Sequence, residues 1–200
     1  MFNRIRKKQL NKFVDKSAKI HSSSIIWEYT RIRENVLIGS NCNIGRNVYI
    51  GSGVVIGENV KIQNNVLIYE PSKIEDGVFI GPGCIFTNDL HPRAVNIDGT
   101  KKSQVDWDKS GVEIYQGASI GAGVICVAPV KIGRWALVAA GSVVISDVAD
   151  FELVAGVPAK RIGWVGKAGV KLVEKETNLY VCPKTNSEFS LIDGKLSEQY

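Results

Sequence analysis

The chain has 200 residues, of which 44% are hydrophobic, and it carries a formal net charge of +5. A chain of this length and apolar content can bury a substantial core as one domain, which excludes an intrinsically disordered protein. No apolar run approaches the length of a transmembrane helix, and the N-terminus is too basic and too interrupted for a signal peptide. We therefore expect a cytoplasmic protein without an integral membrane segment.

The positive charge is concentrated at the N-terminus. Residues 1–16 contain six basic side chains and one acidic one, and the remaining 19 basic and 19 acidic side chains cancel. The body therefore lacks the basic surface of a nucleic-acid-binding protein, and we expect no nucleic-acid partner. We expect residues 1–16 to be a basic leader that is exposed, caps the open end of the structure, or rests as a short helix on an anionic membrane.

The dominant pattern from residue 17 onward is an aliphatic or aromatic residue, here called a slot, at every sixth position. The first run has twelve slots from Ile20 to Phe86, and the second has six from Ile114 to Val144. The fourth residue after a slot is often β-branched, which favours an extended backbone. Glycine often follows a slot directly, which suits a bend with positive φ or a close approach of two backbones. A six-residue period of this kind predicts an all-β chain folded as a parallel β-helix.

Three hexapeptides that close a triangle make one coil, so a coil takes three times six, or eighteen, positions of the sequence. Two positions separated by one such coil then stack on neighbouring coils, at about the 4.8 Å spacing of adjacent strands. Twelve slots make four coils and the later six make two, so we expect residues 17–149 to form the β-helix domain.

A long interruption separates the two runs of slots. Residues 87–112 are rich in Pro, Gly, Asn, Asp and Lys, which predicts one long, exposed, inserted loop. The offset from Phe86 to Ile114 is not a multiple of six, so we expect the chain to re-enter the β-helix in a new phase. Long loops in compact repeats are more often functional than accidental.

The C-terminal residues leave the repeat. We expect residues 150–200 to form a short helix, starting near Pro158, and a mixed tail. The four cysteines include no CxxC pair, so neither a disulfide framework nor a zinc site is indicated, and Cys182 has no second half of a metal knuckle. Cys42, Cys84 and Cys126 lie at inward positions and are predicted to be core residues.

The predicted coil brings polar residues together at the start of the loop. Glu70 and Asn88 are separated by one full coil, so they stack on adjacent coils, above Ser52 and Glu34 in the same column. They form either a small polar site or a row of solvated turn residues. His91 follows in the loop. It would be either a general base, the usual role of a histidine in acyl transfer, or a structural or substrate contact.

Several segments resemble those of the hexapeptide-repeat acyltransferases: the repeated IG units, the loop FTNDLHPRA and the closing AGSVV and VAGVPAKRIGW. More narrowly, WEYTRIRENVLIG, NIGRNVYIG and KIQNNVLIYE look like the branch that N-acetylates nucleotide-linked amino sugars for bacterial surface polysaccharides such as O-antigen. The resemblance covers residues 18–165. It implies a left-handed β-helix, a homotrimer with active sites between subunits, and acetyl-CoA in the groove between neighbouring subunits.

The resemblance also assigns roles to residues near the loop. The asparagine that matches Asn88 is thought to position the amine, with His91 and Glu70 as further catalytic candidates. His91-Pro92 is similar to the pair in O-acetyltransferases whose histidine deprotonates a hydroxyl. Candidate substrate-binding residues are Arg31, Arg33, Glu70, Asn88 and Arg93. Of these, Arg31 and Arg33 lie in the earlier coils, where they either meet a nucleotide diphosphate or are solvated turn residues.

For the cosubstrate acetyl-CoA, the column rule stacks Gly121 under Ala139 and Ala122 under Ala140. Small residues at these bends either leave backbone amides open to the pantetheine arm or simply form tight turns. Lys160 and Arg161 match the family's basic pair near the CoA phosphates. We expect direct transfer in a ternary complex, with backbone N–H groups stabilising the oxyanion and no covalent cysteine intermediate.

The sequence favours an N-acetyltransferase acting on the 3-amino group of UDP-2-acetamido-3-amino-2,3-dideoxy-glucuronate. Alternatives are a dTDP-3-amino-deoxyhexose N-acetyltransferase, an O-acetyltransferase with His91 as base, and a catalytically silent β-helix scaffold. A gamma-type carbonic anhydrase, which shares the fold, needs three metal-binding histidines. This chain has only His21 and His91, in unrelated columns, so we expect no metal.

Overall fold

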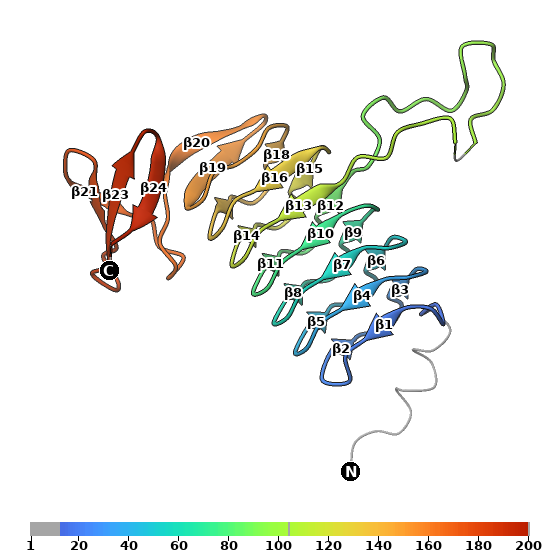
Figure 1. Ribbon diagram of the computed structural model, residues 1–200, viewed down its shortest axis with the longest axis horizontal. Coiled ribbons are helices and arrows are strands. Elements are labelled where there is room, and N and C mark those ends of the chain that lie inside the picture. The colour runs from blue at the N-terminus through green and yellow to red at the C-terminus, as the bar shows by residue number, and fades with distance from the viewer. Residues whose placement is uncertain (1–12, 104, 200) are drawn as a thin grey trace.

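The computed structural model describes residues 13–103 and 105–199, and every regular element in them is a strand. Most of the basic leader, residues 1–16, lies outside the described residues. The described part contains no helix that could cross a membrane. The strands stack in coils along one long axis, from β1 and β2 near the N-terminus to β19 and β20, with a separate small sheet at the C-terminal end (Figure 1).

Three sheets form the three sides of the body. The eighteen strands of the repeat are parallel, and each side takes every third one, while side C is extended by two further strands. Side A contains β3 (Arg31–Ile32), β6 (Tyr49–Ile50), β9 (Leu67–Ile68), β12 (Ile85–Phe86), β15 (Ile125–Cys126) and β18 (Val143–Val144). Side B contains β1 (Lys19–Ile20), β4 (Leu37–Ile38), β7 (Val55–Ile56), β10 (Lys73–Ile74), β13 (Val112–Ile114) and β16 (Val130–Ile132). Side C contains β2 (Ile25–Ile26), β5 (Asn43–Ile44), β8 (Lys61–Ile62), β11 (Phe79–Ile80), β14 (Ser119–Ile120), β17 (Leu137–Val138), β19 (Glu152–Gly156) and β20 (Ala159–Trp164).

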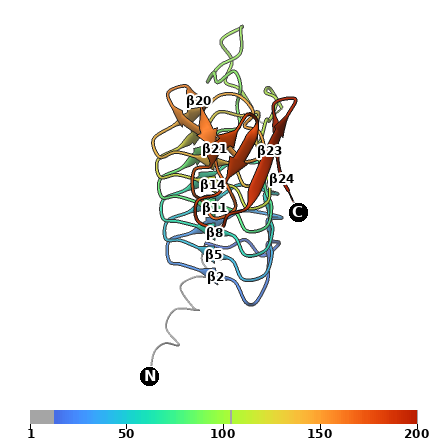
Figure 2. The ribbon, with the colours of Figure 1, turned by 90° about the vertical axis from the view of Figure 1, so that its left-hand side faces the viewer.

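The strand register confirms the predicted length of the coil. Leu37 pairs with Val55, and Tyr49 pairs with Leu67, so each partner lies three hexapeptides further along the sequence. Figure 2 shows the resulting ladder of β2, β5, β8, β11 and β14 along side C. The structure is therefore a parallel β-helix of hexapeptide repeats, consistent with the left-handed form that the resemblance implies.

The loop does not change the phase of the β-helix, which corrects one expectation. Ile74 pairs with Ile114, and Ile80 pairs with Ile120, so the same offset holds on two sides of the triangle. In an uninterrupted repeat, the partner of Ile74 would be residue 92, one full coil later. Ile114 takes that place instead, because the inserted segment lies between the two coils. The physical reason is that the strands above and below the loop still have to pair edge to edge.

The slot side chains fill the interior of the triangle. From Ile32 to Phe86 and from Ile114 to Val144, every slot residue is at most 4% exposed. Cys42, Cys84 and Cys126 are buried in the same core, as predicted. Glycine directly after a slot serves close approach. A Cβ on Gly121 would lie 2.4 Å from the backbone nitrogen of Ala140, although Gly121 does not have positive φ.

The expected C-terminal helix is not present in the described residues 150–199. Instead, β19 adds to the open edge of β17, with Val138 paired to Val154, and β20 folds back antiparallel on β19. This arrangement satisfies backbone groups of β17 that would otherwise face solvent unpaired. A hairpin thus closes side C where a helix was expected.

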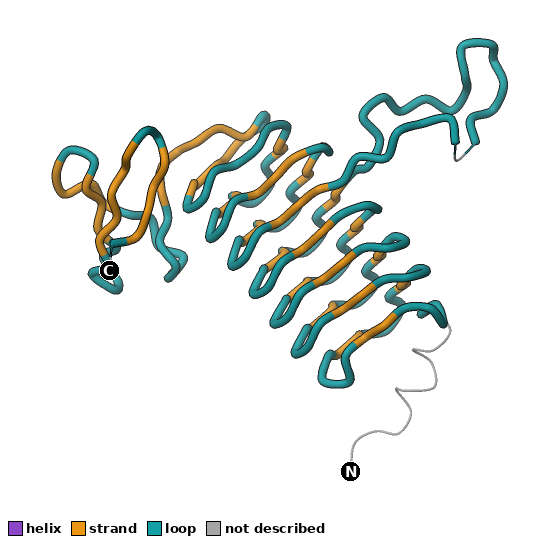
Figure 3. The backbone as a smooth tube through the Cα atoms, in the orientation of Figure 1, coloured by secondary structure: helices purple, strands orange, loops and turns teal. Residues whose placement is uncertain are grey.

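The tail is also folded, as an antiparallel sheet of β21 (Val173–Glu176), β22 (Leu179–Val181), β23 (Glu188–Ile192) and β24 (Lys195–Glu198). Figure 3 shows this sheet beyond the last coil. This sheet and the hairpin share a second apolar cluster. The cluster is made of Phe151, Trp164, Leu172, Cys182, Phe189 and Leu196. Cys182 is therefore a core residue of this sheet.

Candidate functional site

Both ends of the long loop are anchored to neighbouring coils. At its start, the Thr87 hydroxyl accepts a hydrogen bond of 3.0 Å from the N–H of Ala128 on the coil above. At its end, the N–H of Val112 donates to the hydroxyl of Ser72, which is 1% exposed, across 3.3 Å. These contacts hold the loop at a fixed point on the body, from which it projects away from the coils (Figure 1).

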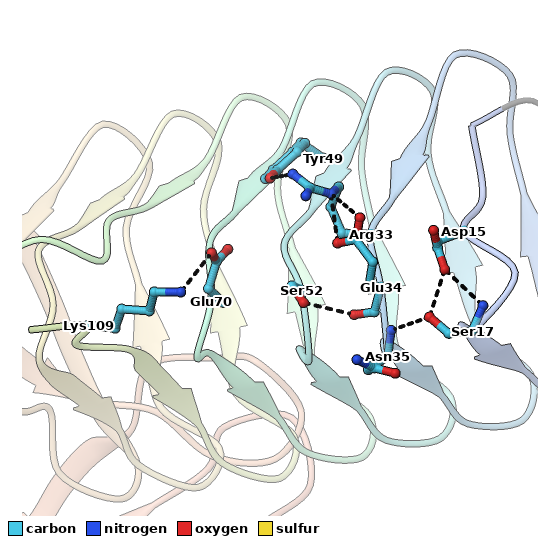
Figure 4. Close-up of polar contacts among 9 residues, drawn as sticks. All are labelled: Asp15, Ser17, Arg33, Glu34, Asn35, Tyr49, Ser52, Glu70 and Lys109. Carbon is cyan, nitrogen blue, oxygen red and sulfur yellow. Dashed lines mark hydrogen bonds and ion pairs between the residues drawn. The ribbon is translucent and has the colours of Figure 1, made fainter. Parts of the chain in front are cut away.

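The outgoing and returning segments of the loop meet at a narrow neck, defined here as residues 88–89 and 109–110. The N–H of Ser110 donates to the backbone oxygen of Asn88 across 3.0 Å, and Asp89 forms an antiparallel bridge with Lys109. The Lys109 ammonium then reaches Glu70 on the coil below, with 3.7 Å between Nζ and Oε1 (Figure 4). Lys109 of the neck and Glu70 of the coil below therefore place one positive and one negative side chain beside Asn88.

The predicted polar column is present at this corner. Glu34, Ser52 and Glu70 follow one another on successive coils, and the Ser52 hydroxyl donates to the backbone oxygen of Glu34 across 3.1 Å (Figure 4). Because Ile68 pairs with Phe86, the register continues to place Asn88 on the coil next to Glu70. The Glu70 carboxylate lies close over Gly51, where a Cβ would come within 2.3 Å of Oε2.

His91 lies in the loop just outside this neck, and its side chain is exposed. Its backbone N–H donates to Oδ1 of Asp89 across 2.9 Å, which fixes the turn that begins the loop. The imidazole has no hydrogen-bond partner among the residues that the structure describes. Within a single chain, His91 thus lies just beyond the neck, and no hydrogen bond from another described residue fixes its ring.

The small residues predicted to accept acetyl-CoA stack at a different corner, at the end of the side C strands. The N–H of Gly141 donates to the oxygen of Ala122 across 2.8 Å, which confirms that Ala122 and Ala140 lie on adjacent coils. Ala122 and Ala140 are exposed, and Gly121 and Ala139 are half-buried. This corner presents backbone with little side chain above it, which suits an extended ligand.

The predicted basic pair lies near this second corner. Ala139 donates its N–H to the oxygen of Val154 of β19 across 2.9 Å, and Lys160 of β20 pairs with Ala155 of β19. Lys160 is exposed, whereas Arg161 lies over the ring of Trp164 at 4.9 Å and 3.9 Å from Glu152. The structure therefore brings these basic residues to the same corner as the small bends.

In one chain, the polar neck and the small-residue corner occupy different corners of the triangle. The neck follows side A, whereas the bends at Gly121 and Ala139 follow side C. A complete site containing both would need two copies of the chain placed side by side.

The two early arginines are less available than the sequence suggests. Arg33 donates through Nε to the Glu34 carboxylate, at 3.0 and 3.2 Å, and through Nη1 to the Tyr49 hydroxyl at 3.3 Å. These hydrogen bonds, led by the one to Glu34, raise the pKa of Arg33. Arg33 also lies three coils from Thr87, about 14 Å at the usual strand spacing. Arg31 points outward from β3 and is exposed.

Lys109 is the site residue that sequence reasoning missed. It lies far beyond Glu70 in the sequence, and its contact depends on how the loop folds back. The available signal was its place three residues before the first strand after the loop, in a segment that must return to the Glu70 corner.

The cysteines of the β-helix do not offer a nucleophile. Burial raises the pKa of the Cys84 thiol and of the Cys126 thiol, so both are protonated at neutral pH. Within the part of the chain that the structure describes, no group of three His, Cys, Asp or Glu side chains is arranged to hold a metal ion.

Comparison with known proteins agrees with the repeat. The family described as bacterial transferase hexapeptide (six repeats) matches residues 17–52 and 53–88, and the hexapeptide repeat of succinyl-transferase matches residues 35–70. The chain is 39% identical over 85 residues to dTDP-3-amino-3,6-dideoxy-alpha-D-galactopyranose 3-N-acetyltransferase of Aneurinibacillus thermoaerophilus, which covers 42% of this chain and 43% of that protein. It is 45% identical over 71 residues to serine acetyltransferase 4 of Arabidopsis thaliana, which covers 36% of this chain and 19% of that protein.

The matches to these two curated relatives therefore span less than half of each relative's own length. Among solved structures, a hexapeptide-repeat-containing acetyltransferase from Vibrio cholerae, crystallised with acetyl coenzyme A, superimposes with a TM-score of 0.53 at 26% identity. That superposition covers 64% of this chain and 69% of the other. Together with the coil geometry, these findings show that the β-helix of this chain is similar to the hexapeptide-repeat transferases, with the family match confined to residues 17–88.

Proposed function

We propose that the protein is an acetyl-CoA-dependent N-acetyltransferase that acts on the amino group of a nucleotide-linked amino sugar. The observation that carries this proposal is the polar neck, where Asn88 lies beside the ion pair of Glu70 and Lys109 at the root of an anchored loop. The side-chain oxygens of Asn88 and Glu70 can accept hydrogen bonds from an amine, so the proposed chemistry calls on neither a thiol nor a metal. The acyltransferase relatives and the solved structure with acetyl coenzyme A support the same chemistry.

In the proposed reaction, the sugar amine attacks the thioester carbonyl of acetyl-CoA directly. The nitrogen bonds to the carbonyl carbon, the carbon–sulfur bond breaks, and the proton lost from nitrogen leaves to solvent or to the departing sulfur. The Asn88 side chain would accept a hydrogen bond from the amine, and the Glu70 carboxylate would stabilise positive charge on the nitrogen. Backbone N–H groups at the bends would stabilise the oxyanion.

The preferred acceptor is the 3-amino group of UDP-2-acetamido-3-amino-2,3-dideoxy-glucuronate, used in surface polysaccharide synthesis. The relative from Aneurinibacillus, whose name contains a dTDP-linked 3-amino sugar, favours a dTDP-3-amino-deoxyhexose as the second candidate. The match to a serine acetyltransferase supports an alternative in which His91 deprotonates a hydroxyl. A cytoplasmic location stays a prediction.

The complete site is proposed to lie between subunits of a homotrimer. Side A presents an outward apolar stripe on five successive coils, made of Tyr49, Leu67, Ile85, Ile125 and Val143. The loop, which leaves from side A, carries four exposed apolar side chains: Leu90, Val95, Ile97 and Val105. A neighbouring copy packed here would cover these side chains and bring its acetyl-CoA corner to the neck.

A thiol-release assay with acetyl-CoA tests this function against a panel of UDP- and dTDP-linked amino sugars and L-serine. We expect turnover with at least one nucleotide amino sugar and a product heavier by one acetyl group on nitrogen. Release of CoA with L-serine alone would move the assignment to O-acetyl transfer. No turnover with any acceptor, together with no binding of acetyl-CoA by calorimetry, would support a silent scaffold.

A further inference from the structure

The loop contains a pocket that the proposed chemistry does not yet use. It has a volume of about 430 Å³ and lies inside the folded arm of the loop, directly beyond the neck. The residues of its lining that bear on its chemistry are Asp89, Arg93, Lys101, Lys102, Ser103 and Trp107. A concave site with a few polar groups around an aromatic wall is typical of a small-molecule site.

The charge of the pocket favours an anion. Arg93, Lys101 and Lys102 form no ion pair with any residue of the described chain, and the only other charged side chain of the lining is Asp89. Arg93 donates to the backbone oxygen of Pro92 across 2.8 Å, which leaves the rest of its guanidinium free. The Asp106 carboxylate, which is bonded to Ser103 and interacts electrostatically with Lys102, adds a second negative charge beside the lining. Three cations against two carboxylates still leave a net positive site, which suits phosphate groups.

The aromatic wall favours a flat ring beside the anion. Trp107 is half-buried, and the Lys109 ammonium lies 5.6 Å from the centroid of its ring. An indole of this kind offers a stacking surface to a nucleobase, which has a flat π-face. Together, three cations and an indole match a base joined to two phosphates.

The backbone around the pocket is braced before any ligand binds. Val95 and Lys101 form an antiparallel bridge, so Lys101 has a fixed position in the arm. The Asp106 carboxylate accepts hydrogen bonds from the hydroxyl and the N–H of Ser103, at 2.7 and 2.6 Å. These hydrogen bonds from Ser103 lower the pKa of Asp106, so this brace is in place at neutral pH.

From these observations we infer that the loop pocket binds a nucleoside diphosphate, with Arg93, Lys101 and Lys102 on the phosphates and Trp107 against the base. The inference rests on the proposed function, because it takes the nucleoside diphosphate to be part of the nucleotide-linked amino sugar that is acetylated. Asp89 of the pocket directly follows Asn88 of the neck, so a sugar held at the neck would carry its diphosphate into the pocket. This placement replaces the expected role of Arg33, which is engaged with Glu34.

Acetyl-CoA also contains a nucleoside diphosphate, so the test must separate the two sources. Calorimetry on the full chain would measure binding of UDP, dTDP, inorganic pyrophosphate and CoA, in wild type and in the double variant Lys101→Ala, Lys102→Ala. Because two charge-assisted contacts are removed, we expect UDP or dTDP to bind at least about tenfold more weakly in the variant, with CoA binding unchanged. The double variant Lys61→Ala, Lys73→Ala, on the exposed faces of side C and side B, serves as the control and should bind as wild type does.

A second pair of variants tests the aromatic wall. Trp107→Phe keeps a stacking ring and should retain most of the nucleotide affinity, whereas Trp107→Leu should lose it. Failure of wild type to bind UDP or dTDP, unchanged nucleotide binding in the lysine variant, or a loss confined to CoA would each overturn the inference. If nucleotide binding follows the predicted pattern but no amino sugar is acetylated, the inference stands and the proposed function fails. If amino sugars are acetylated with an unchanged KM in the lysine variant, the function stands and the inference fails.

Discussion

The ion pair between Lys109 and Glu70 couples the returning end of the loop to the β-helix. Lys109 Nζ lies 3.7 Å from Glu70 Oε1, and the two side chains are 40% and 22% exposed. An ion pair this exposed contributes little to stability, of the order of 0 to 1 kcal/mol. We propose instead that the ion pair positions the Glu70 carboxylate beside the substrate amine.

Replacement of the two candidate catalytic residues separates N-acetyl from O-acetyl transfer. We expect Asn88→Ala to lower kcat/KM by about ten- to a hundredfold, the effect of one lost hydrogen bond to a charged or reacting group. His91→Asn should lower it by less than about tenfold, because an amine that arrives deprotonated needs no base. Steady-state kinetics with the amino-sugar acceptor and acetyl-CoA would measure the kcat/KM of both variants. A loss of about 10² to 10⁴ in His91→Asn alone would instead identify His91 as the general base.

The residues of the site differ in how far the sequence could predict them. Glu70 and Asn88 were predictable because both lie at fixed offsets from slot residues, where the coil length alone places them together. Lys109 and Trp107 were not, because they lie in the inserted loop, whose path follows no period. Arg33 was overrated, since its pairing with Glu34 and Tyr49 depends on side-chain conformation that the sequence does not specify.

Most hexapeptide bends have a left-handed residue at the third position after the slot. Asn35, Asn41, Asn47, Asn59 and Asn65 all lie there, with φ between 56° and 61°. Asparagine tolerates this region better than other residues with a Cβ. Positive φ was one expectation for the glycines directly after the slots, whereas those glycines serve the close approach of backbones. The run of asparagines was the signal that would have located the true bend.

Variants of one such asparagine test this account of the bends. Asn59 has φ of 57°, an exposed side chain, and an N–H that donates to the oxygen of Ser40 across 2.8 Å. Asn59→Gly should leave stability within a few tenths of a kcal/mol, whereas Asn59→Ala should cost about 1 kcal/mol because its Cβ disfavours the left-handed region. Urea unfolding followed by circular dichroism would compare them. Equal stability of the two variants would contradict a steric origin for the asparagines.

Elements with a strict period were predicted well, and those without one were not. The eighteen strands of the β-helix follow from the slots, because that spacing turns every slot side chain toward the interior and buries those from Ile32 onward. The hairpin of β19 and β20 was mistaken for a helix, because local sequence near Pro158 does not show that the edge of β17 needs a partner. The tail sheet was missed for a similar reason, since its core depends on Phe151 and Trp164 from outside the tail sheet.

At the scale of the whole molecule, the proposed site requires more than one copy of the chain. The neck and the small-residue corner lie at different corners of the triangle, and side A carries the apolar stripe through which we propose that copies pack. Leu67→Glu, within that stripe, should dissociate the proposed trimer, because a carboxylate would be buried there without a partner. Val55→Glu, on the outward face of side B and 38% exposed, is the matched control and should leave the assembly intact.

Light scattering during size-exclusion chromatography would give the mass of each variant. Loss of the assembly should also abolish acetyl transfer, since neither corner alone makes a complete site. A wild-type monomer with full activity, or a Leu67→Glu variant that remains a trimer, would contradict this arrangement.

The neck is proposed to transfer the acetyl group to a nitrogen atom of the acceptor. The most direct measurement compares kcat/KM for a nucleotide-linked 3-amino sugar and for its 3-hydroxy analogue, with acetyl-CoA and the same enzyme preparation. A site built to hold an amine beside Asn88 and Glu70 should favour the amino sugar by at least about a hundredfold. Equal turnover of the two sugars, or a preference for the hydroxyl that depends on His91, would contradict the account.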